Sequence, residues 1–260
     1  MILLDGKTIS EKILLDLRSR IQKLGSKLLL SVILIGNDPS SLKYVSLKQQ
    51  KCQEIGIKFD FHHLPENTSQ DKLISLISKL NHDPEVTGFF IQLPLPSHID
   101  KKLVLSKIDI KKDVDGLNPN SDFNPAVVDA IVSLLQNYQI IFTDKKVVII
   151  NDSDLIGKPL LKFFPQAILC NHQTQNLSDI TRSADLLISA TGVKNIITAN
   201  MVREGSIVVD VANGDVDFTA VSPKCSYITP TFGGIGPMTI ACLLKNLTSS
   251  ALAHQRTKDL

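Results

Sequence analysis

The sequence predicts an α/β protein with two lobes, each built on a mostly parallel sheet, joined by two long helices around a cleft. Short apolar runs typical of buried strands alternate with amphipathic patterns typical of helices, which indicates βαβ units. A long helical pattern at 125–138 divides this alternation into two series, and 260 residues with 43% apolar composition suffice for two cores. We expect one domain of residues 1–124 with the C-terminal helix 238–260, and another of residues 125–237.

The first series opens with a capping box, Thr8-Ile9-Ser10-Glu11, which predicts the start of a helix. The strand at 57–63 alternates in polarity, so Ile57, Phe59 and Phe61 should share one face. The predicted elements are, in order, a helix ending at Gly25, a strand at 28–35, a helix from the turn at 36–39 to Gly56, a strand at 57–63, a capped helix at 68–80 and a strand at 88–92.

The second series follows the long helix at 125–138 and again alternates strands with helical patterns. Its predicted strands lie at 146–150, 167–169, 186–189 and 207–211. The last helix pattern runs from Met238 to about His254, which is long enough to return to the first domain.

Composition and charge exclude several classes of function. Lysine and arginine total 28 against 26 acidic residues, the net charge is +2, and tryptophan is absent. We therefore expect no nucleic-acid partner. The longest apolar runs, at 28–30 and 32–35, are too short to span a bilayer, and no secretory leader is evident. The four cysteines lie far apart without metal-ligand spacing, which predicts reduced thiols, no metal site and a cytoplasmic protein.

Tyr44 and Lys48 are the first candidate functional pair. They are four residues apart in a predicted helix, so their side chains share one face. A phenol beside an amine suits proton-transfer chemistry, because the amine can act as base and then as acid. Taken alone, however, the pair is better explained by a solvated surface lysine and a half-buried packing tyrosine.

Two polar motifs follow in the first domain. Gln92 ends an apolar strand, and the carboxyl ends of parallel strands face the usual ligand crevice, although a glutamine that merely ends a strand is common. Lys112-Asp113-Val114-Asp115-Gly116 is a tight acidic turn, for which an ordinary Asx turn is the simpler interpretation when it is taken alone.

A glycine-rich segment, Thr229 to Thr239, precedes the last helix. Its three glycines allow the backbone to approach a ligand closely and leave helix N-terminal amides free for an anion or carbonyl. A purely structural loop of this composition is less usual.

Together these motifs resemble the bifunctional methylenetetrahydrofolate dehydrogenase/methenyltetrahydrofolate cyclohydrolase family. The resemblance covers nearly the whole chain, and it implies a folate-binding catalytic domain followed by a Rossmann-like NAD(P)-binding domain. It rests on four motifs in the family's order: Tyr44-Val45-x-x-Lys48, Gln92-Leu93-Pro94-Leu95-Pro96, Lys112-Asp113-Val114-Asp115-Gly116 and Gly233-Gly234-Ile235-Gly236-Pro237-Met238-Thr239.

The resemblance assigns roles by position. Lys48 matches the catalytic lysine, Tyr44 the folate-stacking tyrosine and Gln92 the glutamine that tunes the lysine. Asp115 matches the aspartate that binds the pterin, where a carboxylate can accept two hydrogen bonds from the amino and ring N–H edge. The further substrate-side residues that the resemblance implies are Ser41, Gly233, Gly234 and Pro237.

The implied activity is oxidation of 5,10-methylenetetrahydrofolate with NADP, or NAD as the alternative, and hydrolysis of the methenyl product to 10-formyltetrahydrofolate. Lys48 needs a lowered pKa for these proton transfers, which burial beside a glutamine permits. The resemblance also implies a homodimer formed through the second lobe. Two alternatives remain: a cyclohydrolase with impaired or NAD-preferring dehydrogenase activity, and a non-catalytic folate-binding protein, against which the retention of Tyr44 and Lys48 speaks.

The cofactor side departs from the family pattern Gly-Arg-Ser-x-x-Val-Gly-x-Pro. The aligned stretch is Asn151 to Pro159, in which Ser153, Gly157 and Pro159 are kept and the arginine is replaced by Asp152. A carboxylate there repels a 2′-phosphate by about 1 kcal/mol per charge pair at about 4 Å in water, and about 4 kcal/mol at an effective dielectric constant of about 20. Asp152 either accepts hydrogen bonds from a ribose diol, which favours NAD, or caps the helix near Gly157.

The remaining cofactor-side candidates are His172, Thr174 and Gly192. His172 and Thr174 fall in Cys170-Asn171-His172-Gln173-Thr174, where the family usually has a His-Ser-x-Thr-like segment. A surface position is the more common use of such a histidine. The stretch between Gly116 and Pro125 is shorter than in the family, so the large departures all lie on the cofactor side.

Overall fold

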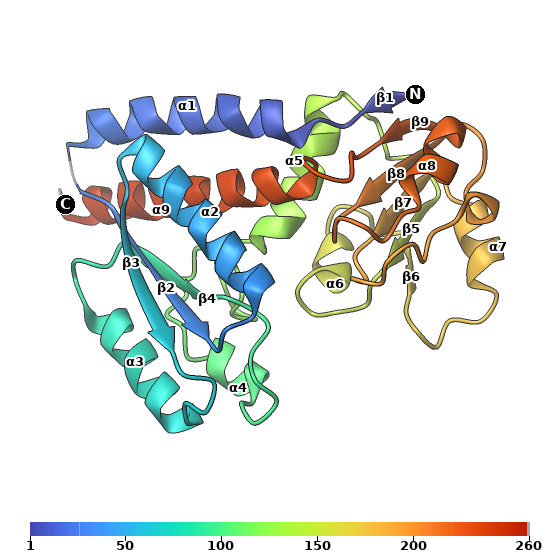
Figure 1. The fold of residues 1–260 in the computed structure, drawn as a ribbon. Coiled ribbons are helices and arrows are strands. Elements are labelled where there is room, and N and C mark those ends of the chain that lie inside the picture. Colours follow the sequence, from blue (N-terminus) through green and yellow to red (C-terminus); the bar gives the residue numbers. More distant parts are fainter. Residues whose placement is uncertain (26, 259–260) are drawn as a thin grey trace. The chain divides into compact units, whose positions relative to one another are not determined.

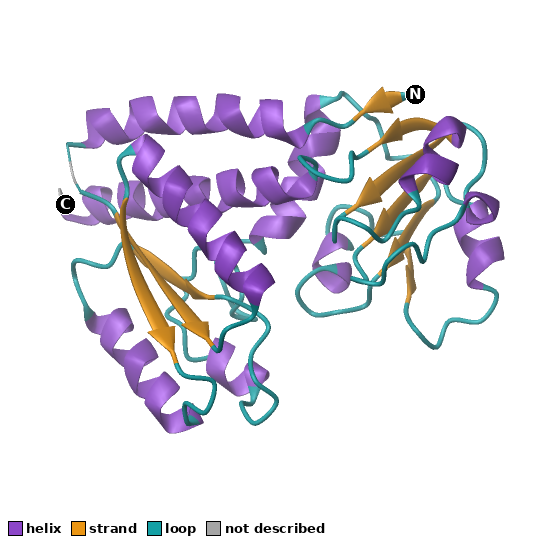
Figure 2. Ribbon diagram, in the orientation of Figure 1, coloured by secondary structure: helices purple, strands orange, loops and turns teal. Residues whose placement is uncertain are grey.

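The structure, a computed structural model, describes the backbone of residues 1–25 and 27–258 and the side chains of these residues as far as 253. Within them the chain forms a three-stranded and a six-stranded parallel sheet and divides into two compact units (Figures 1 and 2). We call residues 12–126 with the segment from Ile240 onward the three-stranded unit, and residues 1–11 and 127–239 the six-stranded unit. The predicted class, α/β with two lobes of parallel sheet, is confirmed.

The three-stranded unit has the strand order β3-β2-β4, with β2 in the centre. The chain steps from β2 to β3 and then back past β2 to β4, so right-handed crossovers place α2 and α3 on opposite faces of the sheet, as Figure 1 shows. Its elements are α1 (Gly6–Leu24, from residue 12), β2 (Leu29–Ile35), α2 (Pro39–Ile55), β3 (Lys58–Leu64), α3 (Gln70–His82), β4 (Gly88–Ile91), α4 (Lys101–Leu105) and α9 (Ile235–Lys258, from residue 240).

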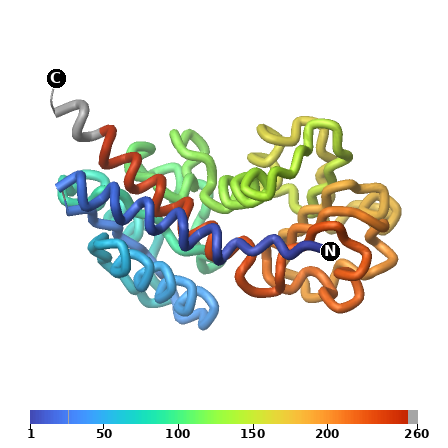
Figure 3. The backbone as a smooth tube through the Cα atoms, turned by 90° about the horizontal axis from the view of Figure 1, so that it is seen from above, coloured from blue at the N-terminus to red at the C-terminus, as the bar shows by residue number. Residues whose placement is uncertain are grey.

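Two long helices, α1 and α9, run side by side within this unit (Figures 1 and 3). The start of α1 differs from the prediction. The helix begins at Gly6, and its capping residue is Asp5, whose carboxylate accepts the Thr8 N–H at 3.1 Å and the Thr8 hydroxyl at 2.6 Å. Thr8 therefore lies in the first turn rather than at the cap, because the aspartate three residues earlier is the stronger acceptor.

The strand β3 forms one edge of the three-stranded sheet. Phe59 and Phe61 share one of its faces, as expected, and their ring centroids are 6.5 Å apart. Phe61 is nevertheless 37% exposed, because an edge strand has a neighbour on one side only. The helix α3 starts at Gln70, and its capping residue is Ser69 rather than the predicted Thr68.

The six-stranded unit has the strand order β1-β9-β8-β7-β5-β6. The order reverses at β5, with β6 on one side and β7 on the other, which is the topological switch of a doubly wound sheet. Its elements are β1 (Ile2–Leu3), α5 (Ala126–Asn137, from residue 127), β5 (Val147–Ile150), α6 (Gly157–Leu160), β6 (Ile168–Cys170), α7 (Leu177–Arg182), β7 (Leu186–Ser189), η1 (Ala199–Met201), β8 (Ser206–Asp210), α8 (Phe218–Val221), η2 (Ser222–Lys224) and β9 (Cys225–Ile228).

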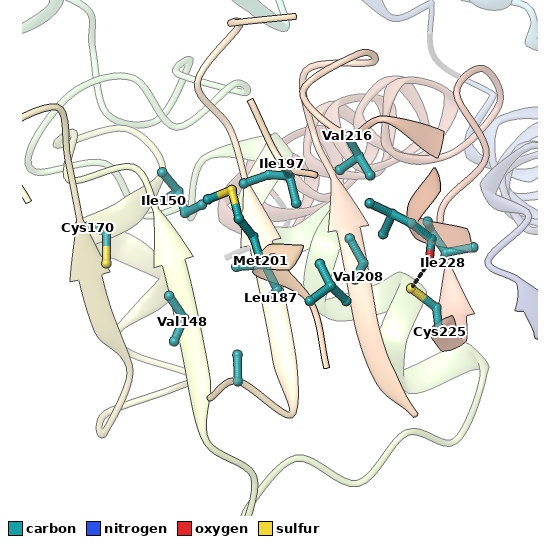
Figure 4. Close-up of a cluster of buried hydrophobic side chains, with 13 residues drawn as sticks. Val148, Ile150, Cys170, Leu187, Ile197, Met201, Val208, Val216, Cys225 and Ile228 are labelled. Atoms are coloured by element: carbon teal, nitrogen blue, oxygen red, sulfur yellow. Dashed lines mark hydrogen bonds between the residues drawn. The ribbon is translucent and has the colours of Figure 1, made fainter. Parts of the chain in front are cut away.

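All four predicted strands of this unit are found within one residue of their expected limits. β1 and β9 were not predicted, because strands of two and four residues give too little periodicity. The strands bury a continuous apolar cluster to which β5 contributes Val148 and Ile150, and β8 contributes Val208 (Figure 4). This burial explains why their sequences read as unbroken apolar runs rather than alternating ones.

No helix within residues 1–25 and 27–258 is both long and apolar enough to cross a membrane. The four cysteines, Cys52, Cys170, Cys225 and Cys242, are free and buried.

Candidate active site

Lys48 is buried in the three-stranded unit, with only 2% of its surface exposed. The helix α2 places it there: Asp38 caps the helix by accepting the Ser41 N–H at 2.7 Å, and Pro39 starts the first turn. The buried residues of α2 recur at helical spacing and include Ser41, Val45, Lys48 and Cys52. The interpretation of Lys48 as a solvated surface charge is therefore wrong.

The Lys48 ammonium is surrounded by polar and aromatic groups. Its Nζ donates to Gln92 Oε1 at 3.3 Å and lies 3.8 Å from Asp115 Oδ2. It also lies 3.8 Å from the centroid of the Phe90 ring and 4.8 Å from that of Tyr44. Ring faces attract a cation, so the two aromatic side chains stabilise the charge without removing it from the buried environment.

Gln92 is fixed so that its carbonyl oxygen faces the lysine. It follows β4, and its backbone N–H donates to the Ile33 carbonyl at 2.8 Å. Its side-chain Nε2 donates to the Leu93 carbonyl at 2.9 Å, which leaves Oε1 for Lys48. A neutral acceptor of this kind hydrogen-bonds the ammonium without fixing its charge as strongly as a carboxylate.

The acidic turn from Lys112 to Gly116 runs beside β4, because the Phe89 N–H donates to the Lys112 carbonyl at 2.9 Å and Phe89 bridges to Asp113. Asp113 holds the turn closed, since its carboxylate accepts the N–H groups of Leu117 at 3.1 Å and Asn118 at 2.7 Å.

Other members of this turn are structural as well. Lys112 Nζ donates to the carbonyls of Leu80 at 3.0 Å and Asp83 at 2.6 Å, at the end of α3. Gly116 has φ = 67°, and a Cβ there would lie 2.4 Å from the Asn124 carbonyl oxygen, so only glycine fits. The Asp115 carboxylate faces Lys48 instead. The simpler interpretation of the motif as a turn is thus correct for Asp113, while Asp115 belongs to the site.

Burial shifts the pKa values of the two charged groups toward each other. Burial lowers the pKa of Lys48, and the Asp115 carboxylate partly opposes this, with a smaller contribution from Cys52. Burial also raises the pKa of Asp115 from 3.8 to about 6, although the Lys48 ammonium opposes it. The site therefore holds an amine that releases its proton more readily than ordinary lysine, beside a carboxylate that binds a proton more readily than ordinary aspartate.

The structure thus brings together Lys48, Gln92, Asp115 and Tyr44, and Ser41 lies on the same helix two turns before Lys48. Sequence reasoning missed Phe90. The signal was present, because Phe90 is two residues before Gln92 in a strand and so shares its face.

The six-stranded unit carries the predicted cofactor-side residues. Asn151 follows β5, and its Oδ1 accepts the Ser153 N–H at 2.9 Å, the Ser153 hydroxyl at 2.6 Å and the Gly157 N–H at 3.2 Å. Gly157 approaches this turn so closely that a Cβ would lie 1.8 Å from the Asn151 carbonyl oxygen. Pro159 follows in the first turn of α6, where no N–H is needed. The N-cap position of α6 is Ile156, which makes no side-chain cap hydrogen bond, and the first amide of the helix is accepted by Asn151 and not by Asp152.

Asp152 is exposed and accepts a hydrogen bond from the segment that follows the neighbouring strand, β6. Its Oδ2 accepts Asn171 Nδ2 at 2.7 Å, and Asn171 follows β6. Thr174 holds the Asn171 turn, because its Oγ1 accepts the Asn171 N–H at 2.8 Å. His172 is exposed in the same turn.

Gly192 follows β7 and has φ = 73°. Its N–H donates to Asp215 Oδ1 at 2.9 Å, and the neighbouring Thr191 N–H donates to Asp215 Oδ2 at 2.6 Å. Asp215 also accepts the Ser189 hydroxyl at 2.6 Å and is 1% exposed. Asp215 therefore fixes the loop after β7, a role that sequence reasoning missed because its partners are more than twenty residues away.

Gly233, Gly234 and Pro237 surround the start of α9 on the six-stranded side. The Gly233 carbonyl accepts the Lys7 N–H at 2.8 Å, and a Cβ on Gly6 would lie 2.0 Å from the Gly234 carbonyl oxygen. These glycines thus have a structural role at the start of α1, whereas their predicted contact with substrate stays a prediction. Pro237 is half-buried in the first turn of α9.

A pocket of about 510 Å³ lies at the carboxyl ends of β7, β8 and β9. Its lining includes Gly192, Lys194, Asn195, Asp217 and Phe232, and the Phe232 ring is 82% exposed. Doubly wound sheets bind dinucleotides at the carboxyl ends of their strands, beside the point where the strand order reverses. The position and size of the pocket fit part of such a ligand.

Comparison with known proteins agrees with this geometry. The sequence model for the tetrahydrofolate dehydrogenase/cyclohydrolase catalytic domain matches residues 4–115, and the model for the NAD(P)-binding domain of the same family matches residues 125–255. The bifunctional protein FolD of Campylobacter jejuni (strain RM1221) is 45% identical over 277 residues, covering 96% of this chain and 98% of the relative. The alignment is longer than the 260 residues of this chain, so the relative has segments that this chain lacks.

Solved structures show the same relationship. A Campylobacter jejuni FolD crystal structure matches with a TM-score of 0.92 and 43% identity, covering 98% of this chain and 99% of the other. The Trypanosoma brucei methylenetetrahydrofolate dehydrogenase-cyclohydrolase, solved with NADP and an inhibitor, matches with a TM-score of 0.94 and 28% identity, covering 98% and 99%. This chain belongs to the tetrahydrofolate dehydrogenase/cyclohydrolase family.

Proposed function

We propose that this protein is a bifunctional one-carbon folate enzyme. It oxidises 5,10-methylenetetrahydrofolate to 5,10-methenyltetrahydrofolate and hydrolyses the methenyl compound to 10-formyltetrahydrofolate. The observation that carries the proposal is the buried Lys48 ammonium beside Gln92 Oε1 and Asp115, in a chain with both domains of the family.

Lys48 is the proton-transfer group in the hydrolysis. As a free amine it takes a proton from the water whose oxygen bonds to the methenyl carbon. As an ammonium it returns a proton to N5 when the bond from that carbon to N5 breaks, and the second water proton leaves as the formyl C=O forms on N10. Burial lowers the pKa of Lys48, which makes the free amine accessible nearer to neutral pH.

The other residues of the site bind and orient the folate. The Asp115 carboxylate accepts hydrogen bonds from the amino and ring N–H edge of the pterin, and the half-buried Tyr44 ring stacks on the folate. Gln92 holds the amine by hydrogen bonding without supplying a second negative charge. Ser41, two turns before Lys48 on α2, is proposed to contact the folate. Substrate contact by Gly233, Gly234 and Pro237 stays a prediction.

The six-stranded unit fits a nicotinamide dinucleotide, because its strand order reverses at β5 and a pocket opens at the carboxyl ends of its strands. When bound, the dinucleotide accepts the hydride released in the oxidation. The residues proposed to hold it follow β5, β6 and β7: Asp152, Ser153, Gly157, Pro159, His172, Thr174 and Gly192.

Two assays test the proposal separately. Purified protein is given methylenetetrahydrofolate with NAD or NADP, and the reduced nicotinamide is followed by absorbance. Separately, the loss of methenyltetrahydrofolate is followed without dinucleotide. Both activities are expected; reduction of neither dinucleotide contradicts the dehydrogenase, and an unaccelerated loss of the methenyl compound contradicts the cyclohydrolase.

A cyclohydrolase without efficient dehydrogenase activity is the second candidate. The internally bonded Asn151 turn and the shorter length of this chain relative to its FolD relative favour it. Hydrolysis without hydride transfer in the two assays identifies this case.

We also propose that the enzyme works as a homodimer in the cytoplasm. The family resemblance supports the dimer, and four free cysteines suit a reducing compartment. Light scattering coupled to size-exclusion chromatography is expected to give twice the 28.6 kDa of one chain, and a mass of one chain contradicts the dimer.

A further inference from the structure

The pairing of Asp152 with Asn171 places a carboxylate at the edge of the six-stranded sheet where β5 and β6 end. The two strands are parallel neighbours, with Ile150 paired to Cys170, so the residues that follow them lie side by side. Asp152 Oδ2 accepts Asn171 Nδ2 at 2.7 Å, and the two residues are 19 positions apart in the sequence.

This is the edge at which dinucleotide-binding sheets recognise the adenosine ribose. In such sheets an acidic side chain about 20 residues after the first turn accepts a hydrogen bond from the ribose 2′-hydroxyl, whereas a nearby arginine accommodates a 2′-phosphate. Here the second strand supplies Asn171 and the first turn supplies the carboxylate. Their hydrogen bond restores an acidic group to this edge of the sheet.

The carboxylate is held in one orientation. Asn171 Oδ1 accepts the Gln173 N–H at 2.9 Å, and the Asn171 N–H donates to Thr174 Oγ1 at 2.8 Å, so the amide Nδ2 is directed to Asp152. A carboxylate accepts at both oxygens, and the hydrogen bond from Asn171 engages Oδ2. Asp152 is exposed, so solvent and ligand reach it.

The charge balance around Asp152 is unfavourable to a phosphate. Lys158 interacts electrostatically with Asp152: its pKa is raised mainly by Asp154 and also by Asp152. Lys158 Nζ is already paired with Asp154 Oδ1 at 2.7 Å. These three side chains together carry one net negative charge, which repels a doubly charged 2′-phosphate and leaves a neutral ribose diol unaffected.

We infer that Asp152, oriented by Asn171, is a specificity-determining residue that makes this enzyme select NAD over NADP. The inference rests on the proposed dehydrogenase function and names the dinucleotide that it uses. The turn after β5 contributes little to phosphate binding, because Asn151 already accepts the Ser153 and Gly157 N–H groups. Discrimination between NAD and NADP therefore depends on the group at the 2′-position of the adenosine ribose.

Calorimetric titration of the intact protein with NAD and with NADP tests this without relying on turnover. We expect NAD to bind at least about tenfold more tightly than NADP, and the ratio to shrink as salt screens the repulsion. Asp152→Asn should bring the two dissociation constants within about threefold, and Asp152→Arg should reverse the preference. Asn171→Ala should weaken NAD binding, because the carboxylate loses the partner that orients it.

A matched control is Asp144→Asn. It removes the same charge from the same unit but lies just before β5, at the opposite end of that strand, so the ratio of dissociation constants should stay unchanged. Circular dichroism and thermal unfolding show that each variant is folded.

The inference is overturned by equal or tighter binding of NADP by the wild-type protein, by an unchanged ratio of dissociation constants in Asp152→Asn, or by the same change in Asp144→Asn. Binding of neither dinucleotide also overturns it and points to the cyclohydrolase-only candidate. Absence of methenyltetrahydrofolate hydrolysis in the wild-type protein contradicts the proposed folate function instead. Failure of the inference and failure of the proposed function are therefore distinguishable.

Discussion

Replacing Lys48 by methionine removes the amine while keeping a long unbranched side chain of similar size. In the wild-type protein Nζ lies 3.8 Å from Asp115 Oδ2. At an effective dielectric constant of about 20 this corresponds to a gross attraction of about 4 kcal/mol, which the burial of both charges offsets. Removing the ammonium also removes the cost of burying it, and Asp115, whose pKa is already raised, can take up a proton instead of remaining an unpaired buried charge. Losing the lysine should therefore destabilise the fold little.

The effect on catalysis should be much larger than the effect on stability. General acid–base catalysis contributes about 10²–10⁴-fold, so Lys48→Met should lower kcat for methenyltetrahydrofolate hydrolysis by at least about a hundredfold. Folate should still bind, because Tyr44 and Asp115 remain. Without the ammonium the pKa of Asp115 rises further, so we expect the dissociation constant to increase by less than about tenfold.

The assay is the loss of methenyl absorbance at saturating substrate, together with folate binding by calorimetry. Lys51→Met is the matched control, because Lys51 lies on the same helix and its side chain is 30% exposed and paired with Glu54 at 2.7 Å. Its kcat should stay within about twofold of wild type. A kcat in Lys48→Met equal to that of the control refutes the role of Lys48.

Other predictions test the supports of the site. The rise in the pKa of Asp115 from 3.8 to about 6 means that the folded state favours the protonated carboxyl, so this group's contribution to stability is greatest below pH 3.8 and is lost as pH rises through about 6. Relative to Asp115→Asn, the wild-type unfolding free energy from denaturant titrations should therefore fall by up to about 3 kcal/mol as the pH rises from 3.8 to about 6. Curves of unfolding free energy against pH that run parallel for the two proteins contradict this. Gly116→Ala should destabilise more than Gly25→Ala, because both glycines have positive φ but only at Gly116 does the added Cβ meet the Asn124 carbonyl, at 2.4 Å; equal losses in thermal unfolding argue against the clash. Asn151→Gly should cost about 1–3 kcal/mol, because it removes the acceptor of three hydrogen bonds. An unchanged unfolding midpoint contradicts this role of Asn151 in holding the turn.

The elements with strong periodicity were predictable from the sequence, whereas their ends were set by individual hydrogen bonds. The strand at 186–189 was predicted at its observed limits, because three consecutive apolar residues in a fully buried strand leave little ambiguity. The predicted start of α1 at Thr8 was wrong, because Asp5 and Thr8 can both cap the helix and sequence spacing alone does not decide between them. β1 pairs with β9 across more than two hundred residues, a contact that local periodicity does not reveal.

The candidate site was predictable in its chemistry but not in its geometry. The motifs identified Lys48, Gln92 and Asp115, yet the burial of Lys48 depends on how α2 packs, which its sequence alone leaves open. The acidic turn holds two aspartates with different roles: Asp113 holds the turn closed and Asp115 faces Lys48. Only the contacts of Asp113 with backbone amides distinguish the two.

On the cofactor side the sequence left two uses of Asp152 open. The hydrogen bond from Asn171 excludes the capping use, because Asn151 already accepts the first amide of α6. That choice depends on a neighbour 19 residues away, brought close by the parallel pairing of β5 with β6.

At this site we propose that a buried amine with a lowered pKa carries out the proton transfers of folate chemistry. The most direct test is the pH dependence of kcat for methenyltetrahydrofolate hydrolysis without dinucleotide, in the wild-type protein and in Lys48→Met. We expect wild-type kcat to rise with pH through an apparent pKa below 10.5, the ordinary value for lysine, and this rise to be absent from the variant. The same rise in both proteins, or no enzymatic acceleration in the wild type, contradicts the proposal.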